Sequence, residues 1–389
     1  MSARTSIEWT ESTWNPVTGC TQVSPGCDHC YAKTIAERFR GGPAYPRGFD
    51  VTLRPHKLDQ PLRWRRPRRI FVNSMSDLFH DDVPDNYIAQ VFAVMALAPR
   101  HTFQVLTKRH ARMRSLLSSD AFWKAADISR SSPVARLDAS GNPTLTNVWL
   151  GVSTENQQWA NIRVPALLDT PAAVRWISAE PLLGPINLLR IPPYGDALTD
   201  LGVAGTTHLD WVVVGGESGH GSRPMHPDWA RSLRDQCTAA GVPFLFKQWG
   251  EWAPERDLNH ASREAAAAAA GTRRGLNYSR TYLRPDGTGS AFGVDEGAGP
   301  GTAMARVGKK AAGRQLDGET WDQYPERVSA DGQPHTPVDA AAGCPVSATT
   351  ADPCPLTARE GPYLLTCCLP AGHQGCCWCN NIQTIDQEN

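Results

Sequence analysis

The sequence has neither a long apolar run nor a net charge. Its 389 residues contain 39 lysines and arginines against 39 aspartates and glutamates, so no overall field attracts nucleic acid. No apolar stretch approaches the roughly 20 residues that a membrane-spanning helix needs. The opening residues, MSARTSIEWTESTW, also lack the basic and then apolar regions of a secretory signal. We therefore expect a cytoplasmic protein with no membrane partner, whose cysteines are ligands more often than disulfides.

Cysteine is almost absent from the middle of the chain. The 11 cysteines form two groups and one isolated residue, namely Cys20, Cys27 and Cys30, seven between Cys344 and Cys379, and Cys237. Cys237 follows Trp229 and Leu233 at four-residue intervals, which is the spacing of a buried helix face. We expect Cys237 to lie in the core and the two groups to bind metal.

Short apolar runs alternate with segments of helical spacing, which is the pattern of β-strands joined by helices. The expected strands are residues 69–73, 102–107, 147–152, 174–178, 209–215 and 243–247. One intervening helix, capped by Asp85, carries Ile88, Val91, Phe92 and Met95 on its apolar face. Near-continuous apolar strands predict a parallel α/β sheet covered on both faces, either an open doubly wound sheet or a full or partial TIM-type (β/α) barrel.

Polar residues follow nearly every predicted strand. They are residues 73–77, 107–109, 153–156, 178–180, 216–218 and 247–248. Both architectures bind ligands at the carboxyl ends of the strands, so we expect a site at this edge. Glu180, Glu217 and Lys247 are its catalytic candidates. Helix capping is an alternative role for Asp77 and Glu155.

Composition divides the chain into three parts. Residues 1–328 carry the strand pattern and form the barrel domain, with a low-complexity insertion at about 253–301 that contains the alanine run 265–270. Residues 329–353 are rich in Ala, Pro, Gly, Ser and Thr and have the composition of a linker. Residues 354–389 form a small Cys-rich appendage that is too short for a hydrophobic core of its own.

The amino-terminal cysteines have the spacing Cys-x6-Cys-x2-Cys. Pro25-Gly26 supplies a bend, and the four-residue recurrence of Tyr31, Ile35 and Phe39 predicts that a helix begins after the third cysteine. Two thiolates separated by two residues can bind one metal or one edge of a cluster. Three ligands favour a cubane iron–sulfur cluster with one open iron, whereas His29 as a fourth ligand would complete a zinc site.

Six motifs together resemble one family. The motifs are WNPVTGC, CDHCYA, SMSDLF, ISAEPLLGP, VGGESG and FKQWG, and the resemblance covers residues 5–328. They are similar to those of the phage-associated three-cysteine-motif family (DUF5131), described as related to radical S-adenosylmethionine (radical SAM) enzymes. The resemblance implies a partial TIM-type barrel in which Cys20, Cys27 and Cys30 hold a four-iron four-sulfur (4Fe-4S) cluster. Such a cluster binds S-adenosylmethionine and, with an electron donor, cleaves it reductively to a 5′-deoxyadenosyl radical.

The resemblance also assigns roles along the polar edge. In radical SAM enzymes a Gly-Gly-Glu segment after the second strand often contacts the methionine amino group, but here that segment ends in Glu217 and follows a later strand. Residues after strand 69–73, which is the second strand when the one before the cysteines is counted as the first, therefore take its place. The polar residues after strand 147–152 face the same opening. The candidate cofactor-binding residues are Ser74, Ser76, Asp77, Ser153, Glu155 and Asn156.

The carboxyl-terminal tail carries cysteine and histidine at short spacings. Metal binding can supply the folding energy that so short a segment lacks, so we expect a zinc knuckle. Its candidate ligands are Cys354, Cys367 or Cys368, His373, and Cys376 or Cys377. A second iron–sulfur cluster and a disordered tail are the alternatives.

The densest basic run consists of Arg63, Trp64, Arg65 and Arg66, which could contact a phosphate backbone and stack on a base. A solvated loop is the alternative.

Three functions remain open. The first is a radical SAM enzyme with an unknown substrate, nucleic acid or a nucleotide being one candidate. The second is a metal-stabilised nucleic-acid-binding module without catalysis, and the third is a barrel hydrolase that uses two of Glu155, Glu180 and Glu217 as acid and base.

Overall fold

The computed structural model describes residues 5–128, 132–138, 141–199, 207–258, 264, 279–291 and 301–325, with short strands beyond them. The chain separates into two compact units, Met1–Thr336 and Pro337–Asn389. No helix in these described segments is long and apolar enough to cross a membrane.

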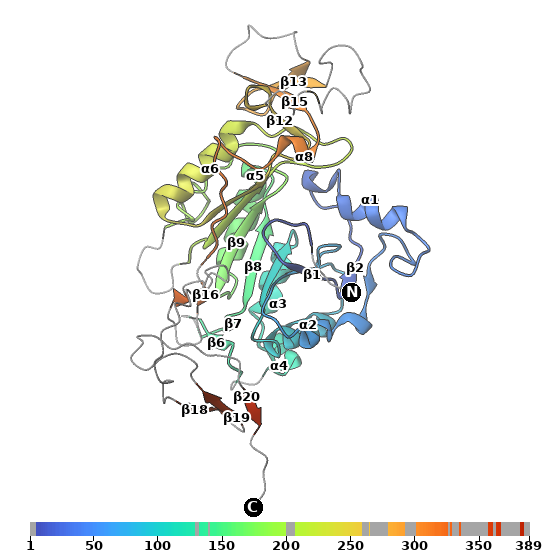
Figure 1. Ribbon diagram of the computed structural model, residues 1–389, viewed down its shortest axis with the longest axis vertical. Helices are drawn as coiled ribbons and strands as arrows, with labels where there is room; N and C mark the ends of the chain where they lie inside the picture. Colours follow the sequence, from blue (N-terminus) through green and yellow to red (C-terminus); the bar gives the residue numbers. More distant parts are fainter. Residues whose placement is uncertain are drawn as a thin grey trace, which may run out of the picture. The chain divides into compact units, whose positions relative to one another are not determined.

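A seven-stranded sheet forms the centre of the first unit (Figure 1). In spatial order its strands are β1 (Ser12–Trp14), β4 (Arg69–Val72), β5 (Thr102–Thr107), β8 (Val148–Ser153), β9 (Val174–Ala179), β10 (Trp211–Gly215) and β11 (Phe244–Gln248). Every neighbouring pair is parallel. Because β1 and β11 are the two edges, the sheet is a curled half-barrel. The α/β class, the parallel sheet and the six predicted strands are confirmed, and the partial form of the barrel is the one observed.

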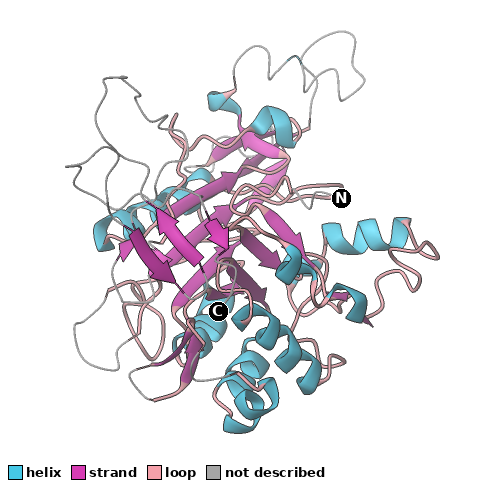
Figure 2. Ribbon diagram, turned by 60° about the horizontal axis from the view of Figure 1, so that its bottom comes forward, coloured by secondary structure: helices cyan, strands magenta, loops and turns pink. Residues whose placement is uncertain are grey.

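Helices surround the sheet (Figure 2). The α-helices are α1 (Tyr31–Arg38), α2 (Asp85–Ala96), α3 (His110–Leu117), α4 (Asp120–Ala126), α5 (Gln157–Leu168), α6 (Pro227–Ala240) and α8 (Lys309–Ala312), and the 3₁₀ turns are Pro25–Cys27, Pro55–Lys57, Gln60–Arg63 and Glu255–Asp257. The apolar residues of α2, α3, α4, α5 and α6 form one large buried cluster with those of the strands. Cys237 of α6 is fully buried in that cluster, as predicted, and burial raises its pKa to about 12. The predicted cap is displaced by one residue, because Pro84 takes the cap position and Asp85 lies in the first turn, paired with Arg112.

The opposite face of the sheet carries a floor of tryptophans. Trp149, Trp176 and Trp211 come from β8, β9 and β10, and Trp9 precedes β1. Trp176 packs 5.2 Å from both Trp9 and Trp211, measured between ring centroids. Gly151 provides the space, since a Cβ there would lie only 2.5 Å from the Trp176 ring. The floor occupies the amino-terminal half of the strands, so their polar carboxyl ends lie above it.

Shorter strands form several small antiparallel sheets. One joins β12 (Trp252–Pro254), β15 (Thr302–Arg306), β13 (Arg280–Leu283) and β14 (Gly289–Ala291). The others pair β2 (Val17–Thr18) with β3 (Thr52–Leu53), β6 (Ala135–Leu137) with β7 (Pro143–Leu145), and β16 (Arg327–Val328) with β17 (Pro334–His335); the second unit joins β18 (Thr357–Glu360), β19 (Tyr363–Thr366) and β20 (Ile382–Thr384). The predicted low-complexity insertion thus contributes strands, although its alanine run lies outside the described residues.

Candidate active site

Two of the predicted catalytic residues face the concave side of the sheet. Side chains alternate along a strand, so Glu180 shares the face of Trp176, four residues before it. Lys247 shares the face of Leu245 in the same way, and both Trp176 and Leu245 belong to the buried floor cluster. Glu180 and Lys247 therefore stand above the floor at the carboxyl edge.

Glu180 and Lys247 form an ion pair that spans β10. The Lys247 Nζ lies 3.2 Å from Oε1 and 3.3 Å from Oε2 of Glu180. Ser178 donates its hydroxyl hydrogen to Oε2 at 3.1 Å. On the intervening strand, a Cβ at Gly215 would lie 2.4 Å from Oε1, so only glycine lets the carboxylate approach this closely. The two side chains are 13% and 18% exposed, which leaves a charged pair within reach of a small molecule.

Glu155 is fully buried beneath the loop between Cys20 and Cys30, which we call the cysteine loop. Arg163 of α5 donates to its Oε2 at 2.9 Å, and Lys108 Nζ lies 3.5 Å from its Oε1. Ser24 of the cysteine loop donates to Oε1 at 2.6 Å. A Cβ at Gly26 would lie 2.3 Å from the same oxygen, so the loop can descend onto Glu155 only with glycine there. Glu155 therefore anchors the cysteine loop.

A second anchor joins the cysteine loop to Glu217. Arg223 donates to both carboxylate oxygens of Glu217, at 2.7 Å and 3.0 Å. The same guanidinium donates to Asp28 Oδ2 at 3.0 Å and to the Pro25 carbonyl at 2.7 Å. The Glu217 side chain is only 5% exposed, so its charge is neutralised by Arg223 and not by water. Glu217 thus positions the loop through Arg223.

The three thiols of the loop are free and partly exposed. Burial, the carboxylate of Asp77 and the thiol of Cys27 raise the pKa of Cys20 to about 12, against the opposing charge of Arg109. The Cys20 thiol reaches only the neighbouring Thr21 carbonyl, at 3.4 Å. In the part of the chain that the structure describes, no three Cys, His, Asp or Glu side chains are grouped closely enough to hold a single metal ion. His29 packs against the loop of Gly221, where a Cβ would lie 2.7 Å from its ring.

Most of the predicted cofactor-binding residues make structural contacts. Asp77 accepts hydrogen bonds from Thr107 Oγ1 and from the amides of Phe79 and Lys108. Ser76 donates to the Val17 carbonyl, Ser74 bonds with Asn15, the Ser153 carbonyl accepts from Arg163, and Asn156 caps α5 by accepting from the Trp159 amide. The capping role considered for Glu155 therefore belongs to Asn156.

Two residues that were not among the predicted site residues stand at the same edge. Asn73 directly follows β4 with a φ of 61° and is 2% exposed, yet neither polar atom of its side chain has a hydrogen-bond partner among the described residues. Tyr31 follows Cys30 and donates its phenol to the Ser74 carbonyl at 2.6 Å. Although Tyr31 is 51% exposed, surrounding atoms and the nearby Cys30 and Glu180 raise its pKa. Tyr31 therefore stands in the mouth of the half-barrel and does not pack on the core.

The predicted nucleic-acid residues lie at the opposite edge, before β4 begins. Trp64 is half-buried against the core, its ring is covered by Arg68 with 5.0 Å between the guanidinium carbon and the ring centroid, and it packs edge-on to His101. Arg63 pairs with Asp59. Arg65 and Arg66 are exposed. The Trp64 indole is thus already covered by Arg68 and is not free to stack on a base. Arg65 and Arg66 remain available for the predicted phosphate contacts.

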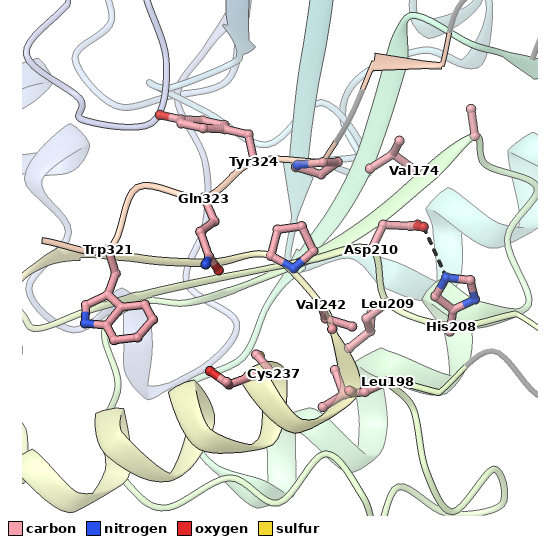
Figure 3. Close-up of a pocket in the computed structure, with 16 residues that line it drawn as sticks. Val174, Leu198, His208, Leu209, Asp210, Cys237, Val242, Trp321, Gln323 and Tyr324 are labelled. Carbon is pink, nitrogen blue, oxygen red and sulfur yellow. Dashed lines mark ion pairs between the residues drawn. The ribbon is translucent and has the colours of Figure 1, made fainter. Parts of the chain in front are cut away.

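A cavity of about 680 Å³ lies at this same amino-terminal edge (Figure 3). Its lining includes Cys237 of α6, Trp321 and Tyr324, with the ion pair of His208 and Asp210 at one side. The cavity is separated from the cysteine loop by the length of the strands and contains none of the predicted site residues. The predicted zinc ligands Cys354, Cys367, Cys368, His373, Cys376 and Cys377 lie outside the described residues.

Comparison with known proteins identifies a family but no characterised relative. No curated protein and no solved structure matches the chain. A family model described as a protein of unknown function (DUF5131) matches residues 4–325, which include the half-barrel and all of the site residues described above. The chain therefore belongs to the DUF5131 family.

Proposed function

We propose that this protein is an iron–sulfur enzyme of the radical SAM kind. Cys20, Cys27 and Cys30 hold a 4Fe-4S cluster, an external electron donor reduces it, and the substrate binds above the tryptophan floor. One observation carries the proposal: three free thiols lie on one loop that two buried carboxylates anchor over the polar edge of a parallel half-barrel.

The residues at this edge fit such a group. Arg163 and Arg109 lie within electrostatic range of Cys27 and Cys20, respectively, although burial and Asp77 oppose the charged form of Cys20 until a metal binds it. Asn73 presents a buried amide with no partner, and such a group costs free energy unless a ligand or water completes its hydrogen bonds. Three thiols without a fourth ligand suit a cubane with one open iron.

A cluster of this kind, when bound and reduced, supplies the reductive cleavage of S-adenosylmethionine. The chain's own residues bind, orient and exclude water. Glu180 and Lys247 offer one negative and one positive group side by side to a polar substrate. The buried floor around Trp176 closes the far end of the half-barrel, so a ligand enters from the carboxyl edge.

The paired carboxylates argue against the hydrolase alternative. A carboxylate that acts as general acid or base must reach the substrate atom with which it exchanges a proton. Glu155, Glu180 and Glu217 each have a cation within 3.2 Å, and Glu155 and Glu217 are buried. The three carboxylates are therefore arranged for anchoring and for ionic recognition.

The test is anaerobic reconstitution of the protein with iron and sulfide, followed by metal analysis. The reconstituted protein is then incubated with S-adenosylmethionine and a reductant, and the products are separated by chromatography. We expect about four irons per chain and a cleavage product that depends on the protein. Alanine at Cys20, Cys27 or Cys30 should abolish both signals equally. Cys237→Ala is the matched control, since it removes a buried thiol and should leave the iron content unchanged. Zinc in place of iron, with intact folding, would refute the proposal and favour the metal-stabilised binding module.

A further inference from the structure

The helix that follows the cysteine loop exposes an apolar stripe. Tyr31 and Ile35 of α1 and Phe39, which caps its carboxyl end, recur every four residues and are 51%, 39% and 55% exposed, respectively. Four-residue spacing places them on one face of the helix. Such a face normally packs on a core, but the core-facing residues of α1 are instead Ala32 and Ala36. Figure 1 shows α1, in blue, projecting beside the open side of the sheet.

The stripe begins inside the mouth of the half-barrel. Tyr31 is tied there by its hydrogen bond to the Ser74 carbonyl, and it lies within electrostatic reach of Glu180. Eight residues of helix rise about 12 Å, which is the length of a few stacked nucleotides. The stripe therefore runs from Phe39 on the surface to the candidate active site.

A cation lies beside the stripe. Residues 31–50 contain Lys33, Arg38, Arg40 and Arg47 against two carboxylates, Glu37 and Asp50, which gives a net charge of 4 − 2 = +2. Arg40 and Arg47 are satisfied by those carboxylates. Arg38 forms no ion pair with any residue the structure describes, and its guanidinium carbon lies 5.7 Å from the Phe39 ring centroid. Lys33 is two residues from both Tyr31 and Ile35 and therefore lies on the other side of the helix. Exposed aromatic rings beside unpaired cations are the usual means of holding a single-stranded nucleic acid.

We propose that the α1 stripe binds a single-stranded segment of nucleic acid and leads one nucleotide into the mouth of the half-barrel. Bases stack on Phe39 and Tyr31, while Arg38 contacts a phosphate. The proposal names the substrate class of the active site, and in that respect it rests on the proposed function. It also moves the nucleic-acid interface from the arginine run 63–66, whose tryptophan is already covered, to the edge that carries the cysteines.

A single strand of nucleic acid fits this stripe better than a folded protein partner does. A stable protein interface covers about 800 Å² on each partner with a broad apolar centre. The α1 stripe is three side chains long, has Arg38 beside it, and ends in a polar mouth with the Glu180–Lys247 pair. An electron-transfer protein that docks here is the competing occupant, and the experiment separates the two.

The experiment measures fluorescence anisotropy of a labelled single-stranded oligonucleotide of mixed sequence with the full chain. Phe39→Ala should weaken binding about 5- to 100-fold, the range for loss of one base–aromatic stack. Arg38→Gln should reduce the slope of log affinity against log salt by about 0.7, because one phosphate is no longer neutralised. Arg65→Gln with Arg66→Gln is the control at the opposite edge and should change the affinity little. Iron content and cleavage of S-adenosylmethionine are measured on the same samples.

Several results would overturn the inference. Loss of affinity only in the Arg65 and Arg66 variant would assign binding to the arginine run. Equal affinity of the wild-type chain and the Phe39→Ala variant would show that the stripe does not bind the oligonucleotide. If Phe39→Ala slows cluster reduction by an acidic electron-transfer protein and leaves oligonucleotide binding unchanged, the occupant is that protein. In each case an intact iron and cleavage signal would show that the inference failed while the proposed function stands.

Discussion

Replacing Arg223 with methionine removes the cation that links Glu217 to the cysteine loop. The Arg223 side chain donates to both oxygens of Glu217, to Asp28 and to the Pro25 carbonyl. Breaking a fully buried pair by removing one partner costs about 3–5 kcal/mol. Arg223 is 33% exposed, so water compensates in part, and its backbone amide still donates to Glu217. We therefore expect the free energy of unfolding to fall by about 2 kcal/mol.

The variant should also loosen one side of the cysteine loop. The two hydrogen bonds to Asp28 and Pro25 involve a charged donor and are together worth a few kcal/mol at most. Losing about 1.5 to 3 kcal/mol raises the population of an opened loop roughly 10- to 150-fold. Cys27 and Cys30 should then react faster with a thiol reagent in the cluster-free protein. Cys20 should change less, because its amide is held by the Phe49 carbonyl.

Urea denaturation followed by tryptophan fluorescence measures the first effect, and alkylation rates resolved by peptide mass spectrometry measure the second. Arg231→Met is the matched control, since Arg231 pairs with Asp317 away from the loop. It should lower stability without changing the relative alkylation rates of the three thiols. If Arg223→Met unfolds more easily but leaves those rates unchanged, Arg223 does not position the loop and the argument from its hydrogen bonds is wrong.

Two further changes test the packing of the first unit. Gly26→Ala should lower the iron bound on reconstitution and accelerate thiol alkylation, because its Cβ would meet Glu155 Oε1 at 2.3 Å. Asp317→Asn should lower the free energy of unfolding by about 1 kcal/mol at pH 7, a figure reduced for solvent exposure, because hydrogen bonds from Arg231 and Arg234 lower the pKa of Asp317 to about 2. A carboxyl whose pKa is lowered in the folded state stabilises that state fully at pH values above its unfolded pKa of 3.8. In urea titrations the difference in the free energy of unfolding between wild type and Asp317→Asn should therefore persist above about pH 4 and vanish as the pH falls to about 2.

Six of the seven strands of the central sheet could be predicted because each is largely buried on both faces. Runs such as Trp211–Gly215 are continuously apolar, and an apolar run this short, rich in valine and bounded by polar residues, favours a strand over a buried helix. β1 (Ser12–Trp14) is only three residues long and was not among the predicted strands. The antiparallel strands near the insertion were missed. Arg280–Leu283 is half-exposed and flanked by glycine-rich sequence, so it lacks the strong apolar signal on which the prediction relied.

The contacts of the candidate site could not be predicted, because they join residues that are far apart in the sequence. Ser24 and Glu155 are separated by 131 positions, and Arg223 and Asp28 by 195. The sequence pattern predicts that a carboxylate follows a strand, but the cation that faces it comes from a different element. Tyr31 was assigned to a helix by its spacing, yet spacing alone does not show whether the stripe faces a core or an opening.

Three strand-end carboxylates that look equivalent in the sequence have different surroundings in the fold. Glu155 bonds to the cysteine loop directly through Ser24, and Glu217 reaches the same loop through Arg223. Glu180 lies on the strand between theirs and bonds to no residue of that loop; its cation, Lys247, comes from the same sheet and stands above the same floor. Two anchors on strands β8 and β10 therefore hold the loop across the end of β9. Glu180 is therefore the carboxylate that faces the space between the loop and the floor. A ligand held in that space contacts the Glu180–Lys247 pair before it contacts Glu155 or Glu217.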